Sequence, residues 1–204
     1  MNMISFFVFL LIWAAAHSFS ASHFWKEWLE KRVGKEFMLR YYRFWYNFFS
    51  VITILPAGLI FISTDSKILY SVELPWKAVM LGGQAAGLLL MGAAILQTGL
   101  WRFVGFAPQA DFNGGEKVPF VTRGVYSWVR HPIYTGTYLL LICDPIMTEF
   151  KLMTYLIFGV YVIIGIYFEE RRLTREFSYL YIDYKARVPM LIPTLKRKQD
   201  APTD

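Results

Sequence analysis

The chain has 204 residues, of which 56% are hydrophobic and 19% aromatic, while only 18% are charged. Soluble domains carry about a quarter of their residues as charges, and the apolar residues here fall into long blocks, so the composition predicts a membrane protein. The formal net charge of +6 comes from basic residues that stand between these blocks, which favours anionic lipid headgroups over nucleic acid. The single Cys143 excludes an internal disulfide and a multi-cysteine metal site.

The first half of the chain predicts three membrane spans. Residues 1–22 contain no Lys, Arg, Asp or Glu, and about 20 apolar residues suffice to cross a bilayer. Because no basic residue precedes this run, we expect a retained span rather than a signal peptide. Residues 44–63 and 76–100 form the second and third spans, and Pro56 predicts a kink or a local break in the second.

Polar and small residues within these spans predict contacts between helices. His17 and Asn47 are expected to form hydrogen bonds with neighbouring helices rather than to act in catalysis. Gly83 and Gly87 stand four residues apart, a spacing that lets two helix backbones approach closely.

The connections between the spans differ in character. Residues 26–43 mix Lys, Arg and Glu with Trp and Tyr, which predicts an amphipathic helix at the membrane surface. Residues 64–75 form a short polar connection. Residues 101–129 form the longest polar loop, and loops of this length in compact proteins often carry function.

The second half predicts a helical hairpin followed by a surface helix. Residues 132–148 and 152–168 form the fourth and fifth spans, and apolar residues at spacings of three and four predict an amphipathic helix over 169–188. The predicted fold is therefore all-α, a polytopic membrane protein with about five transmembrane helices plus a C-terminal amphipathic helix. Residues 1–195 are expected to form a single domain, and residues 196–204 a disordered tail.

The distribution of Lys and Arg predicts the orientation in the membrane. The connection after the first span, the loop before Pro132 and the C-terminal segment are rich in basic residues, whereas the other two connections hold only Lys67 and Lys151. Because cytoplasmic loops carry the excess of Lys and Arg, we expect the N-terminus outside and the C-terminus in the cytoplasm.

Two polar clusters flank the predicted hairpin and are expected to meet at the cytoplasmic face. Arg130 and His131 precede Pro132, which suits the first position of a helix, and a helix N-terminus favours an anionic group. Glu169 and Glu170 end the fifth span. Guanidinium and carboxylate together suit a zwitterionic amino acid. Anchoring of the helix ends at the membrane interface is an equally weighted alternative.

Aromatic residues beside the first cluster extend this hypothesis. Their faces suit an adenine ring or a sulfonium cation, so the set fits S-adenosylmethionine. These residues are Tyr126, Trp128 and Tyr134. The chain has no Gly-x-Ser-x-Gly turn and no glycine-rich phosphate loop, and its three His residues, at positions 17, 23 and 131, form no cluster, so we expect neither a serine hydrolase nor a metal site.

The motif Arg130-His131-Pro132-x-Tyr134-x-Gly136 resembles that of the isoprenylcysteine carboxyl methyltransferases and their phospholipid-methyltransferase relatives. The resemblance extends over residues 120–193 and includes the Glu169-Glu170 pair. It also includes a set of aromatic residues and a closing Val-Pro pair, namely Phe177, Tyr181, Tyr184 and Val188-Pro189. It implies an integral membrane enzyme that transfers a methyl group from S-adenosylmethionine to a small or lipid-like acceptor.

The resemblance also implies roles for individual residues. Positions matching the family's cofactor contacts are Val118, Pro119, Phe120, Val121, Tyr126, His131, Pro132, Tyr134 and Glu169. Arg130 matches an arginine that we assign to orienting substrate or cofactor. Glu170 is a candidate to accept a proton from the nucleophile, with simple pairing to Arg171 or Arg172 as the alternative.

One departure from the family pattern concerns the acceptor. The prenylcysteine enzymes have a basic residue four positions before the matched Glu169, and here that position is Gly165. The acceptor therefore stays open between an isoprenylcysteine carboxylate, a thiol and a lipid headgroup. The alternative from another functional class is a non-catalytic membrane protein that binds a lipid or a small molecule.

Overall fold

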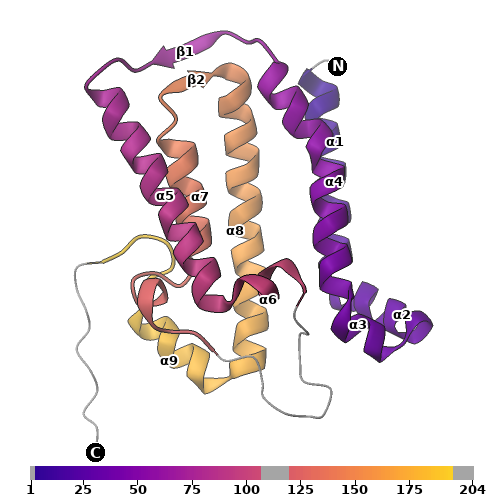
Figure 1. Cartoon of the computed structure of the whole chain (residues 1–204). Helices are drawn as coiled ribbons and strands as arrows, with labels where there is room; N and C mark the ends of the chain where they lie inside the picture. The colour runs from indigo at the N-terminus through magenta and orange to yellow at the C-terminus, as the bar shows by residue number, and fades with distance from the viewer. Residues whose placement is uncertain (1–2, 107–119, 195–204) are drawn as a thin grey trace, which may run out of the picture. The chain divides into compact units, whose positions relative to one another are not determined.

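The computed structural model describes residues 3–106 and 120–194 (Figure 1). Its contacts divide the chain into two compact units. The first contains helices α1 to α4, helix α6 and the residues Met147–Thr154, and the second contains Tyr70–Gln97, Phe120–Ile146 and the chain from Tyr155 onward. The predicted single domain over residues 1–195 stays a prediction, and the predicted tail lies outside the described residues.

The first unit is built on two long antiparallel helices, α1 (Met3–Ala21) and α4 (Tyr42–Ser63). Phe6 of α1 packs in its core with Ala57 of α4 and with Phe150, and the Phe6 and Phe150 ring centroids are 4.7 Å apart. Helix α4 continues through Pro56 without a break. The first and second predicted spans are thus confirmed as helices, and the retention of the first stays a prediction.

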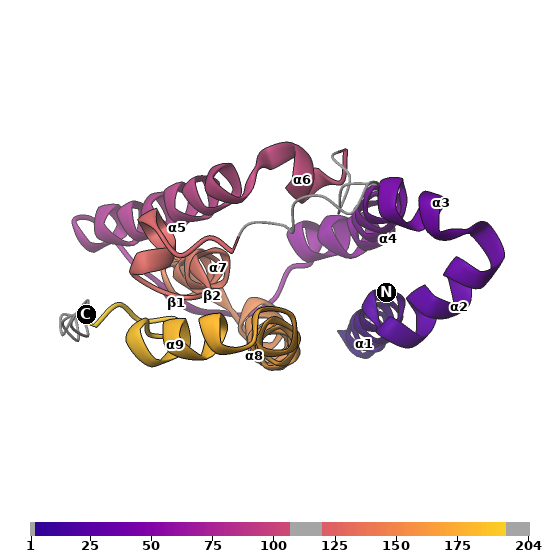
Figure 2. The same cartoon turned by 90° about the horizontal axis from the view of Figure 1, so that it is seen from below.

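Two short helices connect α1 to α4, and they follow one another in an arc when the structure is seen from below (Figure 2). The predicted surface helix over residues 26–43 is two helices, α2 (His23–Val33) and α3 (Lys35–Arg40). They are separated by Gly34, which has a φ of +86°, a backbone angle that glycine adopts at little steric cost. The hydroxyl of Ser22 caps α2 by accepting a hydrogen bond from the Trp25 backbone N–H.

A further short helix, α6 (Leu100–Val104), packs against α4 in the first unit. The Asn47 side chain donates hydrogen bonds to the carbonyls of Phe103 and Val104, at 3.0 and 2.9 Å. The predicted contact of Asn47 with a neighbouring helix is therefore confirmed, although α6 itself was not predicted.

In the second unit, α7 (Pro132–Ile142) lies between α5 (Trp76–Thr98) and α8 (Glu149–Phe177) (Figures 1 and 2). The backbones of α5 and α7 touch at two glycines. A Cβ added at Gly136 would lie 2.5 Å from the Gly87 carbonyl oxygen, and one added at Gly87 would lie 2.7 Å from that of Gly136. The close approach predicted from the glycine spacing in the third span is confirmed.

The chain after the hairpin differs from the prediction. Helix α8 runs on as one helix past residue 169, so the amphipathic helix does not begin there. The break comes at Ser178, which has a φ of +48°, and α9 (Tyr179–Arg187) follows. The fourth predicted span is also shorter than expected because α7 ends at Ile142.

Two short strands, β1 (Ile68–Ser71) and β2 (Ile146–Thr148), pair in a small sheet. Neither strand was predicted: β1 lies in the polar connection over residues 64–75, and β2 lies at the end of the predicted fourth span, residues 132–148. The backbone N–H of Val72 donates to the Pro145 carbonyl at 2.9 Å beside this sheet.

Among the described residues, four helices are long and apolar enough to cross a membrane: α1, α4, α5 and α8. Helix α7 is apolar but has only 11 residues, so the helix alone covers about half of a bilayer about 30 Å thick at 1.5 Å per residue. The chain after it still reaches the end at which α4 and α5 are connected, because β2 pairs there with β1. The predicted all-α membrane fold is confirmed, with about five spans reduced to four long helices and one short one.

Candidate active site

The two predicted polar clusters meet in the second unit. The Nη2 and Nε atoms of Arg130 lie 2.7 and 2.9 Å from Oε1 of Glu170. Both side chains are nearly buried, with 9% and 11% of their surface exposed. A buried charge is tolerated only when it is paired, and here two guanidinium N–H donors converge on one oxygen of the Glu170 carboxylate.

Arg130 uses its remaining nitrogen within the protein. Its Nη1 donates to the carbonyls of Val188 at 2.6 Å and Lys185 at 3.2 Å, at the end of α9. The positive guanidinium is favourable there because the last carbonyls of a helix carry partial negative charge. Glu170 is held from its other side as well, because Nζ of Lys185 donates to Oε2 at 2.5 Å. Arg130 therefore ties α8 and α9 to the start of α7.

The local backbone fixes the position of Arg130 and His131. Their backbone N–H groups donate to the carbonyls of Pro189 and Met190, at 2.8 and 3.2 Å. Pro132 then occupies the first position of α7, as predicted. The hydroxyl of Thr135 donates to the Leu191 carbonyl at 2.8 Å. The segment after α9 thus runs alongside the entrance to α7 and holds it in place.

His131 is buried between the two carboxylates. Its Nε2 lies 3.3 Å from Oε1 of Glu170, and its Nδ1 lies 3.6 Å from Oε2 of Glu169. Only 4% of its side chain is exposed. Because each ring nitrogen faces a different carboxylate, the imidazole sets the spacing of the two glutamates.

Glu169 differs from Glu170 in its surroundings. A third of its side chain is exposed, and its contacts with His131 and Arg172, at 3.6 and 3.9 Å, are longer than ordinary hydrogen bonds. The Tyr134 hydroxyl lies within hydrogen-bonding reach of the same carboxylate. A carboxylate has about four lone-pair sites, so Glu169 can accept further hydrogen bonds from a ligand.

Aromatic residues form a packed group next to this cluster. The ring of Phe120 stacks on Phe177, with 4.8 Å between centroids, and meets Tyr181 and Tyr184 edge-on. The Tyr184 hydroxyl donates to the Tyr126 carbonyl at 2.6 Å, which holds the 3₁₀ turn Gly124–Ser127 against α9.

Tyr181 is the exception in this group. It is 1% exposed, and its hydroxyl has no hydrogen-bond partner among the described residues. Burial, and then the neighbouring Glu170 carboxylate, raise its pKa. The hydroxyl therefore stays protonated, with the Glu170 carboxylate as a neighbouring acceptor to which it makes no hydrogen bond of ordinary geometry.

The structure brings together most of the predicted site. Arg130, His131, Tyr134, Glu169 and Glu170 lie in one cluster, with Pro132 at its edge. Phe120 and Tyr126 belong to the adjoining aromatic group, and Val121 is partly buried next to Phe120 in the chain. Val118 and Pro119 lie outside the described residues. The binding and catalytic roles of all these residues stay predictions.

Sequence reasoning missed one cation at the site and assigned another to the wrong glutamate. Lys185 binds Glu170, the role that had been considered for Arg171 or Arg172, and Arg172 instead lies beside Glu169. On a straight helix, residues 15 positions apart are too far from each other to touch, so the spacing of Glu170 and Lys185 does not predict their contact. Only the turn at Ser178 brings them together, and neither glycine nor proline marks that turn in the sequence.

The long apolar helices define an integral membrane protein. Its buried and half-buried charges form a polar site near the end of one of these helices. The chain belongs to the NnrU protein family, which matches residues 5–188.

Named relatives are similar to part of the chain. It is 41% identical over 83 residues to methanethiol S-methyltransferase 2 of Bradyrhizobium diazoefficiens, covering 40% of this chain and 32% of that protein. It is 36% identical over 89 residues to methanethiol S-methyltransferase of Crocosphaera subtropica, covering 43% and 35%. Protein-S-isoprenylcysteine O-methyltransferase of Rattus norvegicus is 29% identical over 130 residues, covering 55% and 42%.

The chain thus spans less than half the length of these curated relatives. No solved structure matches it. The predicted resemblance to the isoprenylcysteine carboxyl methyltransferases and their relatives is confirmed at the level of the superfamily.

Proposed function

We propose that the protein is an integral membrane methyltransferase that transfers a methyl group from S-adenosylmethionine to a small or lipid-like acceptor. The observation that carries the proposal is the 34% to 42% identity to several methanethiol S-methyltransferases. The clustering of the predicted site residues supports it, because a polar site at the end of a membrane helix suits an acceptor that arrives from the bilayer.

The residues present fit this cofactor. Glu169 is partly exposed and loosely paired, so it suits the positively charged amine. Arg172, with 55% of its side chain exposed, is the accessible cation nearest to Glu169 and suits the carboxylate. Tyr134 and Tyr126 offer aromatic faces for the sulfonium or the adenine.

The contacts of Arg130 and Glu170 favour positioning roles over direct catalysis. Arg130 directs its nitrogens to Glu170, Lys185 and Val188, which leaves little capacity for a ligand. Glu170 accepts from Arg130 and Lys185 at the same time, which makes it a poor proton acceptor for a nucleophile. In this proposal the pair fixes His131, and His131 in turn fixes Glu169.

Bound S-adenosylmethionine supplies an electrophilic methyl group. The residues described above would hold the cofactor so that this methyl group faces the nucleophile of the acceptor. The protein's part is to align the two partners and to exclude water, which contributes through orientation rather than through a covalent step. The apolar flank of α8 before Glu169 is suited to an uncharged or lipid-soluble acceptor.

A thiol is the acceptor class that we favour. Several relatives are named as S-methyltransferases of methanethiol. An isoprenylcysteine carboxylate is less favoured because a basic residue is missing at Gly165, where the space next to the backbone is open. By the excess of Lys and Arg in the connections, we place the site at the cytoplasmic face, with the C-terminus in the cytoplasm and the N-terminus outside.

Two measurements test the proposal. Calorimetry of the full chain in detergent should give saturable heat with S-adenosylmethionine. The affinity should fall at least about tenfold in the Glu169→Gln variant and stay unchanged in Glu176→Gln, an exposed position of the same helix. Transfer of a radiolabelled methyl group should then be strongest with methanethiol, compared with a prenylcysteine analogue and a lipid extract. Absence of both heat and transfer would support the non-catalytic membrane protein instead.

A further inference from the structure

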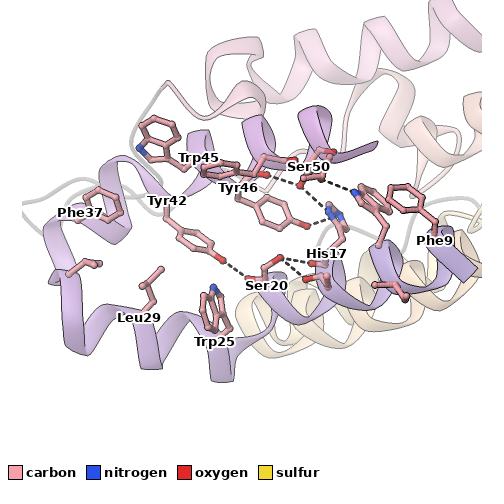
Figure 3. Close-up of a pocket in the computed structure, with 16 residues that line it drawn as sticks. Phe9, His17, Ser20, Trp25, Leu29, Phe37, Tyr42, Trp45, Tyr46 and Ser50 are labelled. Atoms are coloured by element: carbon pink, nitrogen blue, oxygen red, sulfur yellow. Dashed lines mark hydrogen bonds between the residues drawn. The ribbon is translucent and has the colours of Figure 1, made fainter. Parts of the chain in front are cut away.

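The first unit contains a cavity of about 800 Å³ between α1, α2, α3 and α4 (Figure 3). Half of the sixteen side chains that line it are aromatic, and none is Asp, Glu, Lys or Arg. Ligand cavities of this kind have volumes of about 300 to 1,000 Å³. The cavity lies within one unit of the structure and involves none of the residues assigned to methyl transfer.

The polar side chains of the cavity form hydrogen bonds with one another across α1 and α4. The Trp13 indole donates to the Thr53 hydroxyl at 2.9 Å, and the Tyr42 hydroxyl donates to the Ser20 carbonyl. His17 lies between these two bonds, with Nδ1 3.0 Å from the Ser50 hydroxyl and Nε2 2.7 Å from the Tyr46 hydroxyl.

The directions of these bonds assign a neutral His17. The Ser50 hydroxyl donates its only hydrogen to the Tyr46 carbonyl at 2.6 Å, so it accepts from Nδ1–H of His17. Nε2 then accepts from the Tyr46 hydroxyl. Figure 3 shows Tyr46 and Ser50 pointing from α4 toward His17 on α1. The polar groups satisfy one another without a charge and leave an apolar, aromatic wall.

The position of the cavity in the fold indicates where a ligand comes from. Its lining extends along α1 from Phe9 to Ser20, a rise of about 16 Å at 1.5 Å per residue. Both α1 and α4 are long and apolar enough to cross a membrane. At one end the cavity meets α2 and α3, through Trp25 and Phe37, and these two helices are rich in Lys, Arg and Glu.

We propose that this cavity binds a neutral amphiphile with a largely hydrocarbon body, taken up from the bilayer. Neutrality follows from the absence of ionic side chains in the lining, because a buried charge without a partner is strongly unfavourable. The aromatic lining favours a flat or unsaturated body. This site is independent of methyl transfer, so either proposal can fail without the other.

Energy transfer from tryptophan tests the site in the full chain. Trp13, Trp25 and Trp45 line the cavity and serve as donors. The probe is N-phenyl-1-naphthylamine, and its 8-sulfonate is a matched ligand that differs by one negative charge. In lipid nanodiscs the neutral probe should give saturable transfer, and the sulfonate should bind about tenfold more weakly or not at all.

Matched variants separate the cavity from the surrounding lipid. Ala16 lines the cavity and Ala15 does not, although both are exposed on α1. Ala16→Phe should abolish the saturable transfer by filling the space, and Ala15→Phe should leave it unchanged. In the same way Phe49→Ala should weaken binding about two- to tenfold, while Phe48→Ala, next to it and outside the lining, should not.

The proposal is overturned by any of three results: transfer that never saturates, equal binding of the sulfonate, or equal effects of the two members of a variant pair. Because Phe49 is exposed, truncating it leaves the fold intact even if Ala16→Phe does not fold. A thermal unfolding curve for each variant shows whether it is folded, and only folded variants are compared.

Discussion

His17 in the first unit and His131 in the second both satisfy the hydrogen-bonding groups of an imidazole ring, but with different partners. Each is a polar ring in a largely apolar helical structure, and each has a partner at both nitrogens. His17 has two hydroxyl groups as partners, whereas His131 has two carboxylates. The first network needs no net charge. The second needs Arg130 and Lys185 as well, because the Glu170 carboxylate cannot stay buried without cations.

This difference separates a neutral cavity from an ionic site. When one member of a network of neutral groups is removed, the protein loses a hydrogen bond, which lowers the free energy of unfolding by about 0.5–1.5 kcal/mol. In an ionic cluster the removal of one member leaves a buried charge unpaired. Substitutions in the second unit should therefore have larger effects on stability than equivalent substitutions in the first.

The largest effect is expected for Glu170→Ala. The substitution leaves Arg130 buried without its carboxylate and should lower the free energy of unfolding by about 3–5 kcal/mol. Denaturation in detergent micelles, followed by circular dichroism, measures it. Ser50→Ala in the first unit is the comparison, with an expected loss of about 1 kcal/mol. Equal losses would contradict the distinction between the two networks.

A smaller effect, on binding rather than on folding, is expected for Glu169→Gln. Its carboxylate is partly exposed and loosely paired, so stability should change little. Hydrogen bonds to charged groups are worth about 1.5–3 kcal/mol, and the affinity for S-adenosylmethionine should fall at least about tenfold. Calorimetry measures the affinity, with Glu176→Gln as the control. A variant that unfolds would show that Glu169 is structural.

The crossing of α5 and α7 can be tested by making the same glycine-to-alanine substitution at the contact and at a control site on α5. In Gly87→Ala the new Cβ would lie 2.7 Å from the Gly136 carbonyl oxygen, and the expected destabilisation is about 1–3 kcal/mol. Gly92→Ala, on the same helix with open space around it, should be neutral or stabilising by up to about 1 kcal/mol. The same denaturation measurement compares them, and equal effects would mean that the backbones do not touch.

The smallest effects are expected for two tyrosines of α9, and they should have opposite signs. Tyr184→Phe loses the hydrogen bond to the Tyr126 carbonyl and should destabilise the protein by about 1 kcal/mol. Tyr181→Phe removes a buried hydroxyl that has no protein partner and should stabilise the unliganded protein by about 1 kcal/mol. If Tyr181→Phe destabilises as much as Tyr184→Phe, the hydroxyl has a partner in solution.

The sequence predicted the long helices and the meeting of the two polar clusters, because hydrophobic length and Lys/Arg distribution depend on local composition. It also predicted the contacts of His17, Asn47 and Gly87, which are unusual residues for their apolar surroundings. It did not predict that α8 continues past Glu169, since a polar turn of a helix looks the same whether the helix starts or continues there. The breaks at Gly34 and Ser178 depend on single backbone angles and were missed for that reason.

Lys185 shows the limit of such predictions at the site. Its pairing with Glu170 depends on how α9 turns back after Ser178. The cavity of the first unit was missed for a related reason. Its lining comes from α1, α2, α3 and α4, and aromatic residues on membrane helices resemble ordinary packing until the space between the helices is known.

The short segment after α9 also limits how the end of the chain can be altered. Pro189, Met190 and Leu191 supply the backbone oxygens that hold the entrance of α7, and Val188 supplies one to Arg130. A protease or a stop codon that removes residues from 188 onward would release all four bonds at once. A purification tag fused after residue 194 leaves every one of them in place.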